Sequence, residues 1–236
     1  MRLALSSSIP LGSLPKAVRR ARAAMARRLA VAVTALALGW AIAAPAPPGA
    51  REAERMQATG RLRALAPLLE TASGLDDMGK LLAVNRFFNQ RIRFRDDIEV
   101  WGESDHWASP LELLARGEGD CEDFAIAKYF SLLALGIPRS QLRLVYVKAR
   151  LAEAPGSSQA HMVLAHFASP GAEPSILDNL ATGVLPAVRR NDLTPVFSFN
   201  ADGMWLGLGT QPAGDPMERL SRWREVLALA RSEGFP

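Results

Sequence analysis

Cysteine and histidine are scarce in this chain of 236 residues, which contains one cysteine, Cys121, and three histidines. A disulfide bond within the chain and a zinc site built from several thiolates each need at least two sulfur atoms, so both are excluded. If the one cysteine reacts as a nucleophile it needs a base, and the only histidines available are His106, His161 and His166.

Acidic residues are absent from positions 1–43, which hold seven basic side chains. The rest of the chain has 21 basic and 24 acidic side chains, a net charge of about −3. The overall charge of +4 therefore comes from the N-terminal segment. A basic surface on the remainder, as nucleic-acid binding would require, is not indicated.

The N-terminal segment has the order of a secretory signal. Its basic residues end at Arg28, an apolar stretch follows from Leu29 to Ile42, and small residues and prolines come next. This order predicts a secretory signal peptide over residues 1–44, which is removed after export across the membrane. The apolar stretch is shorter than the roughly 20 residues that span a bilayer, which favours removal over an uncleaved membrane tether. Met25 offers an alternative start of the chain.

Apolar residues recur at helical spacing in the first half of the remaining chain. The spacing predicts helices from Arg51 to about Thr71, from Met78 to Phe88 and from Cys121 to Leu135. Ser109, followed by Pro110 and Glu112, is typical of a further helix start. Residues 92–106 mix aromatic and acidic side chains, which indicates a loop or a short extended segment.

The second half of the chain changes to the alternation of strands. Strands are predicted at 142–147, 160–167, 175–177, 196–199 and 204–206, with a polar hairpin loop at 152–159 and a closing helix over 216–232. We expect the last two strands to pair across residues 200–203. Helices followed by an antiparallel sheet predict an α+β fold in one domain, residues 51–236, with the N-terminal helices packed on the sheet.

Cys121 begins the predicted helix after Gly119 and Asp120, a natural capping pair. The free N–H groups and the dipole at a helix start stabilise a thiolate, which is the reactive form of the side chain. The same N–H groups could hold the oxyanion of a tetrahedral intermediate. The alternative is that Cys121 is a small buried residue with no chemical role.

Among the candidate bases, His161 and His166 are five positions apart in one strand and so point to opposite faces. One of them at most faces the helix of Cys121. His161 lies near the strand's start, where a site is open, whereas His166 is interpreted as structural. His106, in a loop, lines a cleft or is simply exposed.

The base needs a third group that fixes its tautomer. Asp178, at the end of the 175–177 strand, is placed for this role, and Asn179 is the alternative. An acid at a strand end can also be an ordinary turn residue.

These motifs resemble the bacterial transglutaminase-like cysteine proteinases. The resemblance rests on the run from Gly119 to Phe130, on Ala160 to Leu164 and on Leu177 to Leu180, with support from 146–149 and 195–200. It extends over about residues 78–206. It implies a papain-like, transglutaminase-core fold with Cys121 as nucleophile, His161 as base and Asp178 as its orienting acid.

The resemblance also implies a function. Members of the family cleave a large surface adhesin near its N-terminus in the periplasm, typically at paired alanines, which releases the adhesin and disperses a biofilm. A cyclic-di-GMP-responsive receptor in the inner membrane sequesters the protease when the nucleotide is abundant. We therefore expect such an adhesin and such a receptor as partners.

Three acids flank the cysteine: Asp120, Glu122 and Asp123. Left alone they would raise the thiol pKa and oppose its activation, because like charges disfavour a thiolate. Bound Ca²⁺ would offset their charge and stiffen the loop, and the resemblance implies calcium dependence through acids at this place. Taken without the resemblance, the acids are also explained as an ordinary first turn that complements the helix dipole.

Two functional alternatives remain at this level. The same three residues would serve a transglutaminase-type acyl transferase or amidase, because only the acceptor of the acyl group differs. A non-catalytic binding module with this fold is the second alternative, and the presence of all three residues argues against it. Trp101 and Trp107, close upstream, could line the substrate cleft or belong to the core.

Overall fold

The computed structural model describes residues 48–150 and 157–236. The predicted signal peptide, residues 1–44, and most of the predicted hairpin loop lie outside the described residues. Within the described ranges, no helix has both the length and the apolar character needed to cross a membrane.

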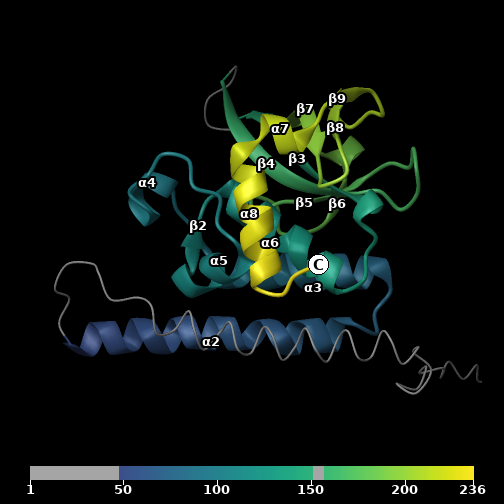
Figure 1. Ribbon diagram of the computed structural model, residues 1–236. Coiled ribbons are helices and arrows are strands. Elements are labelled where there is room, and N and C mark those ends of the chain that lie inside the picture. Colours follow the sequence, from purple (N-terminus) through teal and green to yellow (C-terminus); the bar gives the residue numbers. More distant parts are fainter. Residues whose placement is uncertain (1–47, 151–156) are drawn as a thin grey trace, which may run out of the picture.

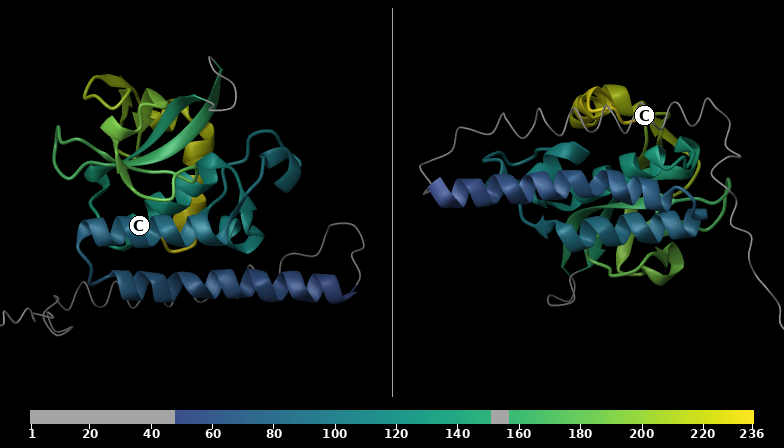
Figure 2. Two further views of the ribbon diagram at one scale, coloured as in Figure 1. Left: turned by 180° about the vertical axis from the view of Figure 1, so that it is seen from behind. Right: turned by 90° about the horizontal axis from the view of Figure 1, so that it is seen from below.

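Four helices from the first half of the chain form a layer beneath the sheet (Figure 1). They are α2 (Pro48–Ala72), α3 (Asp77–Arg91), α5 (Pro110–Arg116) and α6 (Cys121–Ala134). The four predicted helix positions are thus confirmed. Views from behind and below show that α2 is the outermost helix and runs beside α3 (Figure 2).

Two of these helix starts are held by side-chain caps. Asp76 accepts a hydrogen bond from the Gly79 amide at the start of α3. Ser109 and Glu112 form the reciprocal capping box expected at the start of α5, with Pro110 in the first turn. These caps explain why both helices begin where the sequence predicts.

Helix α6 is the centre of the helical layer. Every residue from Asp123 to Leu132 is buried, because α3, α5 and α8 (Ser221–Ser232) surround the helix and β4 lies across it. A helix that is buried on all sides needs apolar residues all round. The predominantly apolar run Phe124–Phe130 meets that need, and Gly136, at a φ of 84°, follows the helix end.

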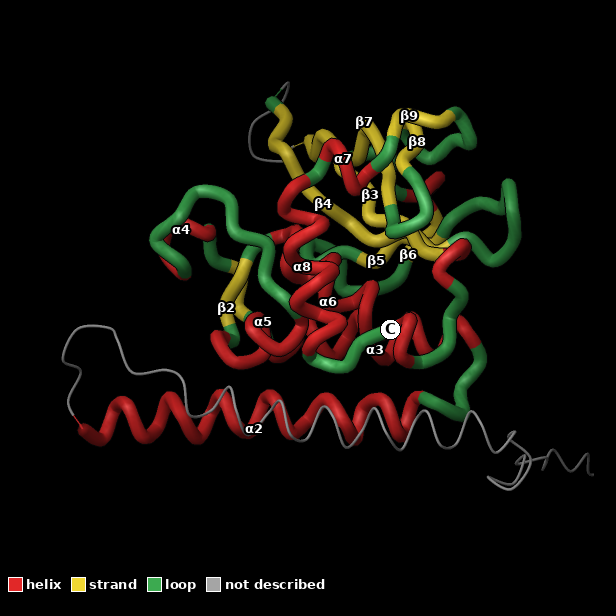
Figure 3. The backbone as a smooth tube through the Cα atoms, viewed as in Figure 1, coloured by secondary structure: helices red, strands yellow, loops and turns green. Residues whose placement is uncertain are grey.

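The second layer is one antiparallel sheet of seven strands, ordered β6-β5-β4-β3-β7-β8-β9 (Figure 3). The strands are β3 (Leu142–Arg150), β4 (Ser158–His166), β5 (Ser175–Leu177), β6 (Leu185–Pro186), β7 (Leu193–Phe199), β8 (Met204–Leu206) and β9 (Pro212–Gly214). All five predicted strands are present. The predicted pairing of the 196–199 and 204–206 segments is also confirmed.

The two faces of β4 join different apolar clusters. Met162 and Leu164 belong to the main core, which contains the α6 side chains. Val163 and Ala165 belong to a second cluster with residues of β3 and β5. The strict alternation of a strand explains this division.

A very short parallel pair, β1 (Arg93–Phe94) and β2 (Glu118–Gly119), links the loop before α4 (Asp97–Val100) to the start of α6. Its effect extends one residue further, because the amide of Arg95 donates to the carbonyl of Gly119 at 3.0 Å. The predicted loop at 92–106 therefore contains ordered elements that the sequence pattern does not indicate.

The C-terminal helix differs from the prediction. Instead of one helix over 216–232, the chain forms α7 (Pro216–Arg219) and α8, with a break at Leu220, whose backbone leaves the helical region. The sequence has no proline or glycine at the break, so the helical pattern continues through it.

Trp223 of α8 closes the core over α6. Its side chain is fully buried, with ring centroids 5.5 Å from Tyr129, 5.9 Å from Phe130 and 5.4 Å from Phe199. Aromatic pairs at such distances add specific contacts to the large apolar area that each ring buries. Trp223 thus connects both layers of the fold.

We expect Trp223→Ala to lower the free energy of unfolding by about 3–5 kcal/mol, because truncation leaves a cavity at this junction. Urea denaturation of the two proteins measures the difference through the transition midpoint at unchanged slope. Trp205→Ala is the matched control, since that partly exposed ring contacts Arg143 at 3.9 Å and should cost only about 1 kcal/mol. Equal losses in the two variants would contradict the role given to Trp223.

Candidate active site

Cys121 is the first residue of α6, with Asp120 as the N-cap. Its half-buried side chain reaches β4, where the backbone N–H of Met162 donates a hydrogen bond to Sγ. Met162 is the residue after His161. The structure thus brings the cysteine to the point of the strand that carries the predicted base.

His161 and Asp178 form a buried pair, with 2.9 Å between His161 Nε2 and Asp178 Oδ1. Burial raises the pKa of Asp178, but the hydrogen bond and charge of His161, the Leu180 amide and Arg190 together hold that pKa well below its usual range. An ionised carboxylate only accepts hydrogen bonds, so Nε2 carries the proton. The lone pair of neutral His161 is then on Nδ1, the nitrogen not used by Asp178.

The other two histidines lie elsewhere. His166 is five residues further along β4, about 16 Å at the rise of an extended strand, and burial lowers its pKa, against the charge of Asp77 in α3. The His106 ring stacks on Trp101 at 4.1 Å between centroids. Asn179, the alternative to Asp178, has no contact with His161 among the described interactions, so His161–Asp178 is the pair that the fold assembles.

Acidic side chains cluster behind the cysteine. Carboxylate oxygens of Asp97, Asp120 and Asp123 lie within 4.8 Å of one another, and those of Asp120 and Glu122 are equally close. Asp97 comes from α4, and no spacing pattern in the sequence connects it to the other three. Asp120 is common to both groups, and Asp97 is an acid that the sequence analysis did not include.

The short β1–β2 pair explains why Asp97 joins the cluster. It holds the chain just before Asp97 beside the chain just before Asp120. Gly119 permits the close approach, because a Cβ there would lie 2.5 Å from Asp123 Oδ2. Only glycine fits at that position without moving the carboxylate.

Two oxygens of this cluster, Asp97 Oδ1 and Asp120 Oδ1, are buried without a hydrogen-bond partner among the described residues. Burial raises the pKa of Asp97, and it raises that of Asp120 to about 10 with the help of Glu122, Asp123 and Asp97. Buried carboxylates with free oxygens are a costly arrangement unless a cation binds them. Hard oxygen ligands in this number fit a Ca²⁺ ion, with backbone or water oxygens completing its shell.

Glu122 also acts on the thiol directly. Cys121 Sγ donates a hydrogen bond to Glu122 Oε2 at 3.0 Å. Burial raises the thiol pKa, and the charge and hydrogen bond of Glu122 and the charge of Asp120 raise it further, while the Met162 amide lowers it. The neighbouring acids therefore oppose thiolate formation, as the sequence predicts for this position without a cation.

The two tryptophans predicted near the substrate cleft are half-buried and pack against the core. Trp101 stacks on His106 and lies 4.8 Å from the Arg116 guanidinium. Trp107 stacks on Phe199 and donates to Asp105. These contacts place both rings in the packing of the fold, and a role in substrate binding stays a prediction.

Comparison with known proteins identifies the family. The model of the bacterial transglutaminase-like cysteine proteinases matches residues 62–194, more than half of the chain. This chain belongs to that family. The transglutaminase-like cysteine proteinases are hydrolases, so the chain is a cysteine protease, as the sequence motifs predict.

Solved structures of Legionella pneumophila LapG are similar to this chain. The EGTA-treated form has 35% sequence identity and a TM-score of 0.67, and the match covers 86% of this chain and 97% of that one. For the calcium-bound form the values are 36%, 0.64, 84% and 96%. Curated protein sequences gave no significant match. The predicted α+β fold is confirmed, and the chain is a transglutaminase-like cysteine proteinase of the LapG type, with an architecture compatible with the papain-like fold.

One residue near the site was missed by the sequence reasoning. Lys128 lies two helical turns after Cys121 on the same side of α6, is fully buried, and its Nζ has no hydrogen-bond partner among the described residues. Burial lowers its pKa to about 7, and the negative charge of Asp178 acts in the opposite direction. An amine that titrates near neutral pH is thus held close to the His161–Asp178 pair.

We expect Lys128→Met to raise the free energy of unfolding by about 1–3 kcal/mol at pH 7, because methionine removes the cost of burying an amine. The unfolded lysine binds its proton up to its ordinary pKa of 10.5 and the folded one only up to about 7, so wild-type stability rises with pH between these values. The gain from the substitution should therefore shrink from pH 7 towards pH 10.

Urea denaturation across this pH range measures the effect. Lys148→Met, at an exposed position of β3, is the control and should show no such trend. If Lys128→Met were less stable than wild type at every pH, the result would instead show that the interaction of the Lys128 amine with Asp178 stabilises the folded protein.

Proposed function

We propose that this transglutaminase-like cysteine proteinase is a calcium-dependent endopeptidase of the periplasm that uses Cys121, His161 and Asp178. The observation that carries the proposal is the meeting of three elements. Cys121 at the start of α6 accepts a hydrogen bond from the backbone N–H of Met162. The adjacent His161 lies with its Nε2 2.9 Å from Asp178 Oδ1. A nucleophile, a base and an orienting acid on separate elements are the arrangement that acyl transfer from a peptide requires.

The chemistry follows from these positions. Sγ of Cys121 attacks the scissile carbonyl carbon, and Nδ1 of His161 accepts the thiol proton. N–H groups in the first turn of α6, which lack partners within the helix, stabilise the oxyanion. His161 then gives its proton to the leaving amine as the C–N bond breaks, and a thioester on Cys121 remains. A water molecule that loses its proton to His161 hydrolyses this thioester.

Asp178 assists this reaction in two ways. Its carboxylate fixes the Nε2–H tautomer, which keeps Nδ1 free for the thiol proton. Its negative charge then stabilises the imidazolium that forms during attack. Both roles require the carboxylate to be ionised, which is the state favoured by its low pKa.

Calcium belongs to the proposal through Asp97, Asp120, Glu122 and Asp123. When bound there, the ion supplies positive charge that offsets these carboxylates and so lowers the pKa of the thiol. The unpartnered oxygens of Asp97 and Asp120 support this site. LapG of Legionella pneumophila, which is similar to this chain, has been solved in calcium-bound and EGTA-treated forms.

The substrate and partners are proposed from the family resemblance. We infer a large surface adhesin that is cut near its N-terminus at paired alanines, with biofilm dispersal as the outcome. An inner-membrane cyclic-di-GMP receptor that sequesters the enzyme completes the proposal. The basic and apolar order of residues 1–44 supports export to the periplasm, where both partners would be met.

Purified protein should cut an N-terminal adhesin fragment, and Cys121→Ala and His161→Ala should each lower the rate by about 10³-fold or more, because each removes a reacting group. Mass spectrometry of the products gives the cut site. A labelled amine in the same mixture tests the acyl-transferase alternative. Amine incorporation without chain cleavage would contradict the protease function, and unchanged adhesin release by Cys121→Ala would support the binding-module alternative.

EGTA should abolish this cleavage and excess Ca²⁺ should restore it. Asp97→Asn should weaken calcium binding by about tenfold or more, since affinity depends on the number of charged ligands. Asp96→Asn is the matched control, because Asp96 is the exposed neighbour and lies outside the acidic cluster. Calorimetric titration and the calcium dependence of cleavage measure both variants. Full activity after thorough chelation would remove calcium from the mechanism.

A further inference from the structure

The orienting acid itself has a partner that the sequence motifs do not include. Asp178 Oδ1 accepts hydrogen bonds from His161 and from the Leu180 amide, and Oδ2 lies 2.7 Å from Nη2 of Arg190. Arg190 follows the short helix η3 (Ala187–Arg189) in the connection between β6 and β7. A buried ion pair thus joins this distant connection to the His161–Asp178 pair.

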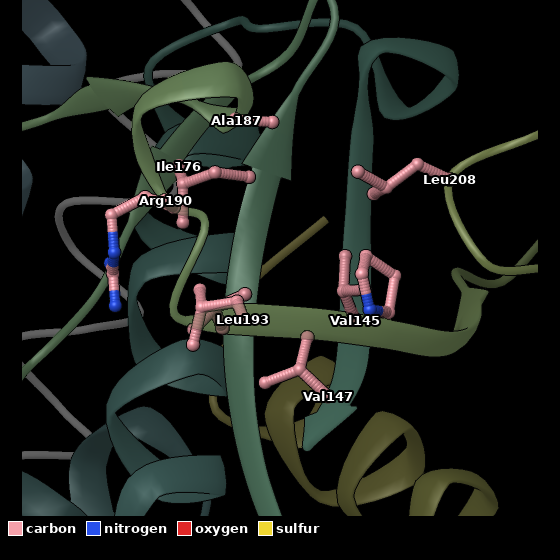
Figure 4. Close-up of a pocket in the computed structure, with 9 residues that line it drawn as sticks. Val145, Val147, Ile176, Ala187, Arg190, Leu193 and Leu208 are labelled. Atoms are coloured by element: carbon pink, nitrogen blue, oxygen red, sulfur yellow. The ribbon is translucent and has the colours of Figure 1, made fainter. Parts of the chain in front are cut away.

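Arg190 is held in one orientation from two sides. Its Nε and Nη2 donate to the two carboxylate oxygens of Asp192 at 3.0 and 2.8 Å, the paired geometry in which a guanidinium is most firmly fixed. Its side chain is only 7% exposed. The residue also lines a cavity of about 160 Å³ with Leu193 and Val145, and Figure 4 shows its guanidinium directed away from Val145 and Leu208.

We propose that Arg190 is a positioning residue of the protease, which acts through Asp178 to keep its carboxylate ionised and aimed at Nε2 of His161. The inference rests on the proposed roles of Cys121, His161 and Asp178, and adds a fourth residue to them. Arg190 touches neither the nucleophile nor the base in the described interactions, so its effect on catalysis passes through the acid.

The charges around Asp178 show why such a residue is needed. Its carboxylate is almost fully buried, and burial alone would favour the neutral acid. The Leu180 amide and two side chains, His161 from β4 and Arg190 from the β6–β7 connection, oppose this, while Asp192 adds a negative charge nearby. The amine of Lys128 in α6 also interacts with Asp178, but burial lowers its pKa to about 7, whereas Arg190 stays charged. Arg190 therefore supplies the charge that persists at neutral pH.

Four variants test the proposal, each with calcium at saturating concentration so that metal-linked changes are common to all. Arg190→Gln removes the positive charge. Arg190→Lys keeps the charge but loses the paired hydrogen bonds that the guanidinium makes to Asp192. Asp192→Asn weakens these paired hydrogen bonds and keeps the arginine. Arg139→Gln is the matched control, because Arg139 forms a more exposed ion pair with Asp202 at 3.0 Å.

The first readout is the pH profile of kcat/KM on a fluorogenic peptide that contains paired alanines. Arg190→Gln should lower kcat/KM by about 10- to 100-fold, as loss of an outer-shell partner does for metal-binding histidines. Its acid limb should move to higher pH by about one unit or more, because without the guanidinium charge the His161–Asp178 pair takes up a proton at higher pH. In Arg190→Lys the acid limb should return most of the way to its wild-type pH. Asp192→Asn should lower kcat and leave the pH of the acid limb unchanged, and Arg139→Gln should match wild type in both.

The second readout needs no substrate. The chain has three histidines, so the ring nitrogens of His161 can be followed by NMR. Proton uptake by the His161–Asp178 pair should change these signals at a pH about one unit or more higher in Arg190→Gln than in wild type.

The outcomes separate the positioning role from the proposed function. Lower activity in Arg190→Gln with an unchanged acid limb and unchanged His161 titration would mean that Arg190 only supports the fold, and would overturn the inference. Full activity in Arg190→Gln would also overturn it. If wild type cleaves no peptide while the His161 titration shifts in Arg190→Gln, the positioning role stands and the protease assignment of these residues fails.

Discussion

The contact between the start of α6 and strand β4 is the constraint on which the rest of the structure depends. Helix α6 is buried along ten consecutive residues from Asp123 to Leu132, so other elements must cover it on every side. That requirement places α3, α5 and α8 around it and the sheet across it. The same packing brings the first residue of α6, Cys121, to the Met162 amide beside His161. A purely structural demand, the covering of an apolar helix, thus assembles the proposed catalytic residues.

Two groups of buried charges lie close to this contact and behave in opposite ways. Asp178 lies beside His161 and Arg190, which together with the Leu180 amide keep it ionised in spite of burial. In the cluster of Asp97, Asp120, Glu122 and Asp123, burial and the neighbouring carboxylates raise the pKa of Asp97 and Asp120, and His106 only partly offsets this at Asp97. The difference follows from the partners alone, because the side chains are chemically alike. Asp178 is thus ionised beside His161, whereas the acidic cluster keeps unpartnered oxygens, which is the basis for the calcium site we propose.

Much of the fold could be predicted from sequence because its main elements carry strong local signals. The helical spacing before Ala134 and the alternation after Leu142 correspond to the two layers, and the capping box at Ser109 identifies a helix start correctly. The break at Leu220 and the two-residue strands β1 and β2 were not predicted, since they are shorter than any period that a pattern needs. For the same reason Asp97 escaped the prediction of the acidic cluster, because only the β1–β2 pair connects it to Asp120.

The sequence by itself determined the local chemistry: one cysteine at a helix start, three acids around it, and a histidine and an aspartate at the ends of neighbouring strands. These follow from composition and short-range periodicity, which act within a few residues. Only the tertiary structure decided which groups meet. The pairing of His161 with Asp178, the addition of Asp97, and the placement of Lys128 and Arg190 beside Asp178 all join residues from different elements. Such contacts depend on how the layers pack, and no local pattern in the chain encodes them.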